Sequence, residues 1–360
     1  MKRILLRCLH HLQADRLLRL LSRRRIKILV YHGFTDKNTH EGIENNQGKH
    51  LNVDVFRAHL QHLSKYYRVI PLDRLIDHYA RGAPIPDRSV AITIDDGYES
   101  TYTLACPILK EYAVPATVFL TTNFVDNNEW LWTDRLEYAM TSTTASVLEV
   151  EIGGEMLSYD LHNNASKLAC DSQLRSRLKL MRQEFLSSAV ADVERALGRR
   201  PPAENEMPEI YRPLQWRQVV EMVEGGMVSL GSHGATHVVL TRCGPDRARA
   251  ELVSSKELIE RRTGVDCRFF CYPNGQIGCF DRETRGWLQE LGYCCGITTV
   301  FGTNDERSDA FELKRLYIDE RGELLQFIMT VSGVVGVLNG VKRLLLGIGR
   351  GARAADEGEE

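Results

Sequence analysis

The alternation of apolar and amphipathic segments is the feature of this sequence that most constrains its fold. From Ile26 onward, short apolar runs typical of buried strands are followed by segments with the periodicity of helices. Continuous apolar strands joined by helices predict a parallel sheet with helices on its faces. Residues that follow the strands would then meet at one end of the sheet, where α/β barrels carry their sites. The predicted strands are 26–32, 68–72, 89–95, 116–122, 227–233, 268–273, 294–298 and 315–319.

Composition excludes several classes of protein. Of the 360 residues, 43% are hydrophobic and 26% are charged, which is typical of a globular chain and not of a collagen-like or disordered one. With 46 Lys and Arg against 48 Asp and Glu, the net charge of −2 gives no indication of nucleic-acid binding. Because the nine cysteines are odd in number and form no CxxC motif, we expect free thiols in place of disulfides or a thiolate zinc site.

The strand–helix alternation is interrupted over residues 124–210. Within this stretch the pattern predicts a β-hairpin across Gly153-Gly154 and a long helical segment over 164–197. We interpret 124–210 as an α+β insertion that elaborates one loop of a main domain spanning 26–322.

Both ends of the chain have an amphipathic pattern. Residues 1–25 carry leucines at helical spacing beside seven Arg and predict a basic amphipathic helix, while 323–360 predict an amphipathic segment that ends in an acidic tail, 351–360. Such helices either pack on the fold or lie on an anionic membrane surface, and the sequence leaves both interpretations open. No signal-peptide pattern or uninterrupted membrane span is found, so we expect a cytoplasmic protein, with the inner membrane surface as the place of any peripheral contact.

Two polar motifs follow predicted strands. Asp95 and Asp96 end an apolar strand, and adjacent buried carboxylates need a compensating charge, which a divalent cation usually supplies. His233 and His237 follow a later strand, and we expect their spacing to place both imidazoles on one face of a helical turn. Two His and one carboxylate leave coordination positions open for water and substrate, which is typical of a catalytic site. We predict that the two motifs share one metal site.

These two motifs, in this order, resemble those of the polysaccharide deacetylase family, also described as the NodB-homology or carbohydrate esterase 4 domain. The resemblance covers about 26–122 and 211–320. The segments that carry the resemblance are Ile94 to Gly97, Ser232 to His237, Tyr31 to Gly33, Trp216 to Gly226, Phe270 to Gly275 and Leu313 to Ile318.

The resemblance implies a distorted, NodB-like (β/α) barrel and hydrolysis of an N-acetyl group on an amino sugar. It makes Asp96, His233 and His237 the ligands of a divalent metal, with Zn²⁺ the expected ion, and Asp95 the general base. This assignment is chemically coherent because a bound cation lowers the pKa of water and polarises an amide carbonyl, while a carboxylate beside it accepts the proton.

The resemblance also places an oxyanion-binding turn after the strand 268–273. Tyr272, Pro273 and Asn274 form this turn, and a backbone N–H, most directly that of Asn274, is expected to donate to the tetrahedral oxyanion.

This sequence departs from the family pattern at three points. Cys271 occupies the place of an Arg that orients the base, and Arg315 is our candidate substitute, with a structural Arg as the alternative. No His follows His237, so the usual acid for the leaving amine is missing, and we assign His32 to that role, with a core His as the alternative. Position 234 is Gly where Ser or Thr is frequent in the family. This difference should affect the interactions that hold the ligand side chains in place, and not the binding of the metal by those side chains.

Two other functions are alternatives to a metal-dependent N-deacetylase. Two His and one carboxylate also suit a non-haem Fe(II) oxygenase, although that chemistry has no need for a second Asp beside the ligand. A non-catalytic sugar-binding or assembly protein on the same fold is the main alternative. We expect an N-acetylated sugar as substrate, with a nucleotide-linked or lipid-linked form favoured by the expected location, and no nucleic acid as partner. Aromatic and basic residues of the insertion could stack on a sugar or form its core, and we favour the core for Trp130, Trp132, Arg135 and Tyr138.

Overall fold

The computed structural model describes residues 2–318 and 324–345. The predicted acidic tail, 351–360, lies outside the described residues.

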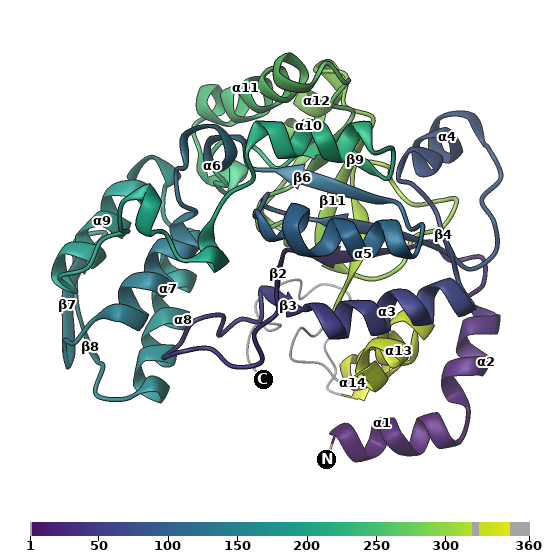
Figure 1. The fold of residues 1–360 in the computed structure, drawn as a ribbon, viewed down its shortest axis with the longest axis horizontal. Helices are drawn as coiled ribbons and strands as arrows, with labels where there is room; N and C mark the ends of the chain where they lie inside the picture. Colours follow the sequence, from purple (N-terminus) through teal and green to yellow (C-terminus); the bar gives the residue numbers. More distant parts are fainter. Residues whose placement is uncertain (1, 319–323, 346–360) are drawn as a thin grey trace.

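A closed parallel barrel forms the centre of the molecule (Figure 1). Its strands follow the order β1-β12-β11-β10-β9-β6-β5, and β1 also pairs with β5, which closes the ring. A short strand, β4, pairs with the start of β5, and the register shifts between β11 and β12. The predicted distorted (β/α) barrel is therefore confirmed. The strands are β1 Lys27–Tyr31, β4 Arg68–Val69, β5 Ser89–Ile94, β6 Ala116–Leu120, β9 Val228–Ser232, β10 Phe269–Cys271, β11 Cys295–Phe301 and β12 Leu313–Tyr317.

The barrel strands are apolar on both faces because each face packs against a different core. One buried cluster contains Leu29 and Val90 from the strands with Leu60, Leu109 and Leu252 from the surrounding helices. A second cluster draws its members from strands all around the ring and therefore fills the interior; it includes Ile28, Ala91, Phe119, Phe269, Ile297 and Leu313. The covering helices are α3 Val53–Tyr66, α4 Asp73–Arg81, α5 Cys106–Glu111, α10 Trp216–Glu224, α11 Pro245–Thr263 and α12 Arg282–Glu290.

The segment after β6 forms a separate body with its own core, on the left of Figure 1. The predicted hairpin is present as β7 and β8, which turn at Gly153-Gly154, but the predicted helical segment is two helices because residues 181–185 interrupt it. Trp132 lies in this core, while Trp130 and Tyr138 pack around Tyr211, so these aromatic rings have structural partners. α6 Thr122–Asn127 follows β6 and packs against α11. The elements of the separate body are α7 Trp132–Ser142, β7 Val147–Ile152, β8 Glu155–Asp160, α8 Asn164–Leu180 and α9 Leu186–Ala196. A small parallel sheet of β2 Gly33–Thr35 and β3 His50–Asn52 lies between β1 and α3 in sequence and was not predicted.

The N-terminal segment is two helices, α1 Lys2–His11 and α2 Ala14–Leu21, so the prediction of a single helix over 1–25 was wrong. The chain breaks because Gln13 adopts a left-handed conformation with φ of 57°. Both helices pack against α13 Leu324–Ser332, which is followed by α14 Val334–Leu345. Among the described residues, no single helix is long and apolar enough to cross a membrane; α13 and α14 reach that length and apolarity only together, and they are bent by 72°.

Candidate active site

Two carboxylates and two imidazoles meet where β5 and β9 end. Asp95 and Asp96 follow β5 directly, and His233 follows β9. The Nε2 atoms of His233 and His237 lie 3.6 Å and 3.5 Å from Oδ1 of Asp96. The ligand atoms of Asp96 and the two imidazoles all lie within 4.8 Å of one another, a spacing that can hold a metal ion. The structure thus brings the three predicted ligands together.

The intervening strand, β6, sets the distance between the two motifs. The backbone N–H of Thr121 donates to the carbonyl of Asp96 at 3.0 Å, and that of His233 donates to the carbonyl of Leu120 at 2.8 Å. Thr122 then donates to the carbonyl of Gly234 at 3.1 Å. The end of β6 therefore holds the aspartate turn on one side and the histidine loop on the other.

The loop that carries the imidazoles is not a helical turn, so that prediction was wrong. Gly234 and His237 have φ values of 77° and 58°, which no right-handed turn contains. The carboxylate of Glu251 on α11 shapes the loop: it accepts the backbone N–H groups of Ala235 and Thr236, both at 2.8 Å, and the Thr236 hydroxyl. Glycine suits position 234 because of its positive φ, and this explains the absence of a larger residue there.

The donor atoms suit a divalent cation. Nδ1 of His233 lies 2.7 Å from the carbonyl oxygen of Cys271, so its Nε2 is directed toward the carboxylates. Burial lowers the pKa of His237 to about 3, which keeps this imidazole neutral near neutral pH. Oδ1 of Asp96 is buried and has no hydrogen-bond partner among the described residues. An acceptor oxygen that is buried without a donor, between two imidazoles, is an arrangement that a cation would satisfy.

Asp95 has a different environment because Arg315 binds it with both terminal nitrogens. Nη1 and Nη2 of Arg315 lie 2.8 Å and 2.7 Å from the two carboxylate oxygens of Asp95. Burial alone would raise the pKa of Asp95, but Arg315 and then His233 lower it below its ordinary range. The carboxylate is therefore ionised near neutral pH, and it lies 4.0 Å from Nε2 of His233.

Cys271 contacts the same carboxylate from β10. Its Sγ lies 3.5 Å from Oδ2 of Asp95, and burial raises its pKa well above the ordinary value, so the thiol is protonated and donates. Cys271 supports Asp95 without supplying a charge, and the guanidinium comes from Arg315 on β12. The predicted substitution of Arg315 for the missing family Arg thus has the geometry that it needs, and its role stays a prediction.

The predicted oxyanion turn follows β10, which neighbours β9 in the barrel. Tyr272 is buried and donates its hydroxyl to the carbonyl of Phe311, and Pro273 lies beside Gly234 of the histidine loop. Asn274 has a φ of 59°, and its Nδ2 is buried without a hydrogen-bond partner among the described residues. Asp96, His237 and Asn274 all have positive φ, a strained conformation that gathers at functional sites.

His32 follows β1, the neighbour of β5, and lies close enough to the carboxylates to affect them. Burial would raise the pKa of Asp96, but electrostatic interactions with His237 and then His32 lower it. The structure therefore places His32 at the same end of the barrel as the predicted ligands, and its proposed role as acid stays a prediction.

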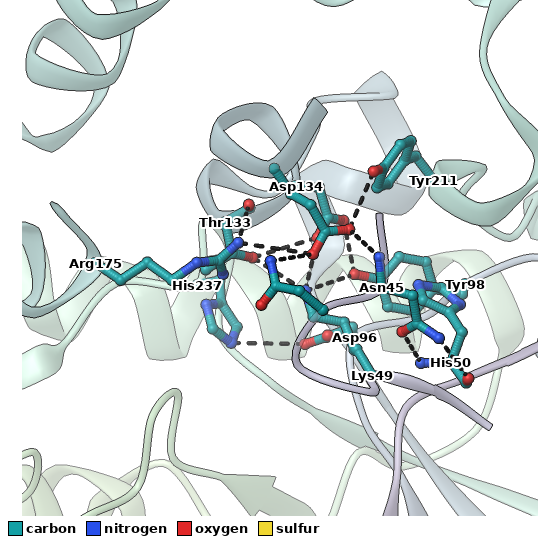
Figure 2. Close-up of polar contacts among 12 residues, drawn as sticks. Asn45, Lys49, His50, Asp96, Tyr98, Thr133, Asp134, Arg175, Tyr211 and His237 are labelled. Carbon is teal, nitrogen blue, oxygen red and sulfur yellow. Dashed lines mark hydrogen bonds and ion pairs between the residues drawn. The ribbon is translucent and has the colours of Figure 1, made fainter. Parts of the chain in front are cut away.

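A buried network of charges next to the ligands was not predicted (Figure 2). Nζ of Lys49 lies 2.6 Å from Oδ1 of Asp134 and 3.0 Å from the hydroxyl of Tyr98, and that hydroxyl donates to Oδ2 of Asp134 at 2.6 Å. Burial would lower the pKa of Lys49, but Asp134 and then Asp96 raise it. Because Tyr98 is two residues beyond Asp96, the network links the aspartate turn to α7 of the insertion.

Comparisons with known proteins agree with this geometry. In sequence, the chain is 20% identical to the Bacillus subtilis protein YxkH, named as a polysaccharide deacetylase, over 296 residues that cover 82% of this chain and 71% of YxkH. It is 29% identical to the poly-beta-1,6-N-acetyl-D-glucosamine N-deacetylase of Staphylococcus epidermidis over 150 residues, 40% of this chain and half of that relative.

The fold is similar to that of solved deacetylases. The Streptococcus pyogenes deacetylase PplD superposes with a TM-score of 0.55 at 18% identity, over 85% of this chain and 98% of PplD. IcaB from Ammonifex degensii superposes with a TM-score of 0.53 at 16% identity, over 86% of this chain and 97% of IcaB. The family model for polysaccharide deacetylase matches residues 82–296, which include the Asp95-Asp96 motif and both imidazoles. The chain therefore belongs to the polysaccharide deacetylase family.

Proposed function

We propose that this protein is a metal-dependent N-deacetylase that hydrolyses the N-acetyl group of an amino sugar. The observation that carries the proposal is that the two adjacent carboxylates at the end of β5, Asp95 and Asp96, have different surroundings. Asp96 directs an unpartnered, buried oxygen toward two imidazoles, whereas Asp95 is held ionised by Arg315. One carboxylate is thus available as a ligand and the adjacent one as a base.

In this proposal, each residue of the site has a separate role in the reaction. Asp96, His233 and His237 would hold the cation, which supplies a lowered pKa for water and polarisation of the amide carbonyl. Asp95 accepts the proton of the attacking water, and Arg315 keeps its carboxylate ionised and oriented. Asn274 donates to the developing oxyanion, and His32 returns a proton to the leaving amine.

The family and the names of the relatives support an N-acetylated amino sugar as the proposed substrate class. Two kinds of amino sugar are candidates: a polymer of N-acetylglucosamine, such as the Staphylococcus epidermidis relative is named for, and a nucleotide-linked or lipid-linked precursor. A panel of β-1,6-linked N-acetylglucosamine oligomers, nucleotide-linked N-acetylglucosamine and lipid-linked N-acetylglucosamine, assayed for released acetate, would separate them.

Substitution of the ligands tests the metal site. Asp96→Ala, His233→Ala and His237→Ala should each lose most of the bound metal and nearly all acetate release, because two protein ligands hold a zinc-like ion poorly against water. Metal content of purified protein and acetate release are the measurements, and His162→Ala, on an exposed loop residue, is the control.

Two outcomes would contradict the proposal. Full metal content in all three variants would show that the metal ion binds at another place in the protein. A wild-type protein that binds N-acetylated sugars but releases no acetate when loaded with any of Zn²⁺, Co²⁺ or Ni²⁺ would support the alternative, a non-catalytic sugar-binding protein.

A further inference from the structure

The terminal helices present an exposed apolar surface that the rest of the chain does not cover. On α1 and α2, Leu6, Leu9 and Leu18 face α13 and α14, while a second set of leucines faces outward. The exposed side chains of α14 continue this pattern. We call the following exposed residues the terminal surface: Ile4, Leu5, Leu12, Leu17, Leu20, Leu21, Val337, Val341, Leu344 and Leu345.

The size of this surface is unusual because single exposed leucines are common but groups of them are not. Leu12, Leu21 and Leu344 are 76%, 70% and 81% exposed, so most of the surface of each residue faces solvent. More than half of the large apolar side chains that are exposed in the described part of the chain lie on α1, α2, α13 and α14.

The four helices form one group on the molecule. α13 lies against α3 and packs with α1 and α2, and α14 follows it and also contacts α2. In Figure 1 they gather below α3, on the side away from the hairpin β7–β8 of the insertion. The exposed apolar side chains of helices that are far apart in sequence therefore share one region of the molecule.

Basic residues accompany the apolar ones. Arg16 and Arg24 are exposed on or just after α2, and Lys342 and Arg343 are exposed on α14. Within residues 2–25 and 324–345, Asp15 is the only acidic residue in the sequence, and its side chain is buried beside His10. The terminal surface is therefore apolar and positively charged, with no exposed carboxylate of its own helices.

These properties select one kind of partner. A second copy of the chain would bring the same basic residues together, and like charges at an interface are unfavourable. A membrane span is disfavoured because Phe327, Met329 and Val331 of α13 are already buried in the protein. Helices with leucines on one face and Arg or Lys beside them bind in the plane of a bilayer that carries anionic lipids.

We propose that the terminal surface binds the protein peripherally to an anionic lipid bilayer, with the leucines of α1, α2 and α14 in the headgroup–acyl boundary and the basic residues at the lipid phosphates. This proposal does not depend on the proposed function, because no residue of the active site belongs to the terminal surface.

Vesicle sedimentation of the full-length protein tests the proposal. With vesicles of phosphatidylcholine and phosphatidylglycerol in a 3:1 ratio at low salt, the wild-type protein should sediment, and it should be released as salt rises because charge attraction is screened. With phosphatidylcholine alone, binding should be much weaker. Deletion of α1 and α2 is a poor test because it would uncover Met329, so exposed residues are substituted instead.

The decisive variant is Leu17→Ser/Leu20→Ser/Leu21→Ser, which changes three exposed side chains of α2. We expect its partition onto anionic vesicles to fall by at least about tenfold, since apolar burial and charge act together in such helices. The matched control, Met156→Ser/Leu180→Ser/Phe185→Ser, removes equally exposed apolar residues from the insertion and should bind like the wild-type protein.

Three results would overturn the proposal. The first is a wild-type protein that does not sediment with anionic vesicles at low salt, and the second is a Leu17/Leu20/Leu21 variant that binds as tightly as the wild type. The third is a dimer in analytical ultracentrifugation that this variant dissociates, without vesicle binding by the wild type, which would assign the terminal surface to a second copy of the chain.

Discussion

Asp95 and Asp96 are neighbours in sequence, yet the structure gives them unlike partners. Both are buried, but Asp95 is bound by a guanidinium and Asp96 faces imidazoles. Arg315 is itself wholly buried, and its Nε donates to the carbonyl of Thr298. At this scale the chemistry of the site depends on which carboxylate receives a fixed positive charge from the protein.

Asp95→Asn tests the role of the base. The amide has nearly the shape of the carboxylate but does not accept a proton, so the variant should keep its metal and lose a factor of about 10²–10⁴ in kcat. Acetate release and metal content are measured on the same preparation. Unchanged turnover would show that another group takes the proton.

Arg315→Met tests the positioning of that base. Loss of the guanidinium leaves a buried, uncompensated carboxylate, so the pKa of Asp95 should rise and the acidic limb of the kcat–pH profile should move to higher pH. The free energy of unfolding should fall by about 3–5 kcal/mol, the usual effect of removing one partner of a buried pair.

The conservative variant Arg315→Lys separates the two effects. It keeps a positive charge and should restore part of the stability and part of the pH profile. A merely structural Arg315 would change stability in urea denaturation and leave the acidic limb of both variants where it is in the wild type.

The sequence was most informative about residues that lie next to each other along the chain. Asp95 with Asp96 and His233 with His237 could be identified because each pair is local and follows an apolar strand. The contact of Arg315 with Asp95 joins residues far apart in sequence, and only the family comparison, which noted a missing Arg at Cys271, indicated it. Glu251 and Lys49 gave no signal, because charged residues are usually exposed.

At the scale of elements, the site is a set of loops held by the elements beside them. β6 spaces the aspartate turn from the histidine loop, and α11 shapes that loop through Glu251. The predicted helical turn over 233–237 failed for this reason: a spacing of four is compatible with a helix, but a carboxylate from another element fixes a different conformation here. The strands, by contrast, were predictable because burial on both faces leaves a continuous apolar run.

Glu251→Gln tests the support of the histidine loop. An amide retains one acceptor oxygen but loses the charge that binds two backbone N–H groups and a hydroxyl, so His237 should be held less firmly. We expect metal affinity to fall by about 10–100-fold, the effect seen when supporting partners of ligands are removed.

Competition with a chelating dye gives the affinity, and Glu257→Gln, an exposed residue of the same helix, is the control. Equal affinities for the wild type and Glu251→Gln would show that the loop keeps its conformation without that charge.

At the scale of the whole molecule, the chain joins a barrel, an insertion with a separate core, and terminal helices that close over α3. The contact of α13 with α3 is made by aromatic rings: His59 stacks on Phe327 with ring centroids 3.8 Å apart. Burial lowers the pKa of His59 to about 3, and burial also lowers that of His62 to about 4. Both imidazoles are neutral in the folded protein at neutral pH.

This contact should make the protein sensitive to acid. In the unfolded chain a histidine titrates near 6.5, so below that pH the unfolded state binds more protons than the folded state. Stability is complete above pH 6.5 and falls as pH decreases toward the folded pKa, and His59 alone costs up to about 1.4 kcal/mol per pH unit in this window.

Urea denaturation between pH 7 and pH 4.5 measures this dependence. The variant His59→Leu should show a shallower loss of stability with acid, whereas His11→Gln, on an exposed residue, should match the wild type. Identical slopes for His59→Leu and the wild type would assign the acid sensitivity to other groups.

The ring closes through strands from both ends of the chain, and this has a consequence for how the protein is made. Asp96 is synthesised long before either imidazole, and the strands β9 to β12 that complete the ring come after the whole insertion. During synthesis, the early part of the chain therefore carries one of the three proposed ligands, which alone would bind an ion weakly. At the proposed metal site, binding would then require the last strands, so the rate at which a refolding chain acquires a metal ion should follow the rate of ring closure.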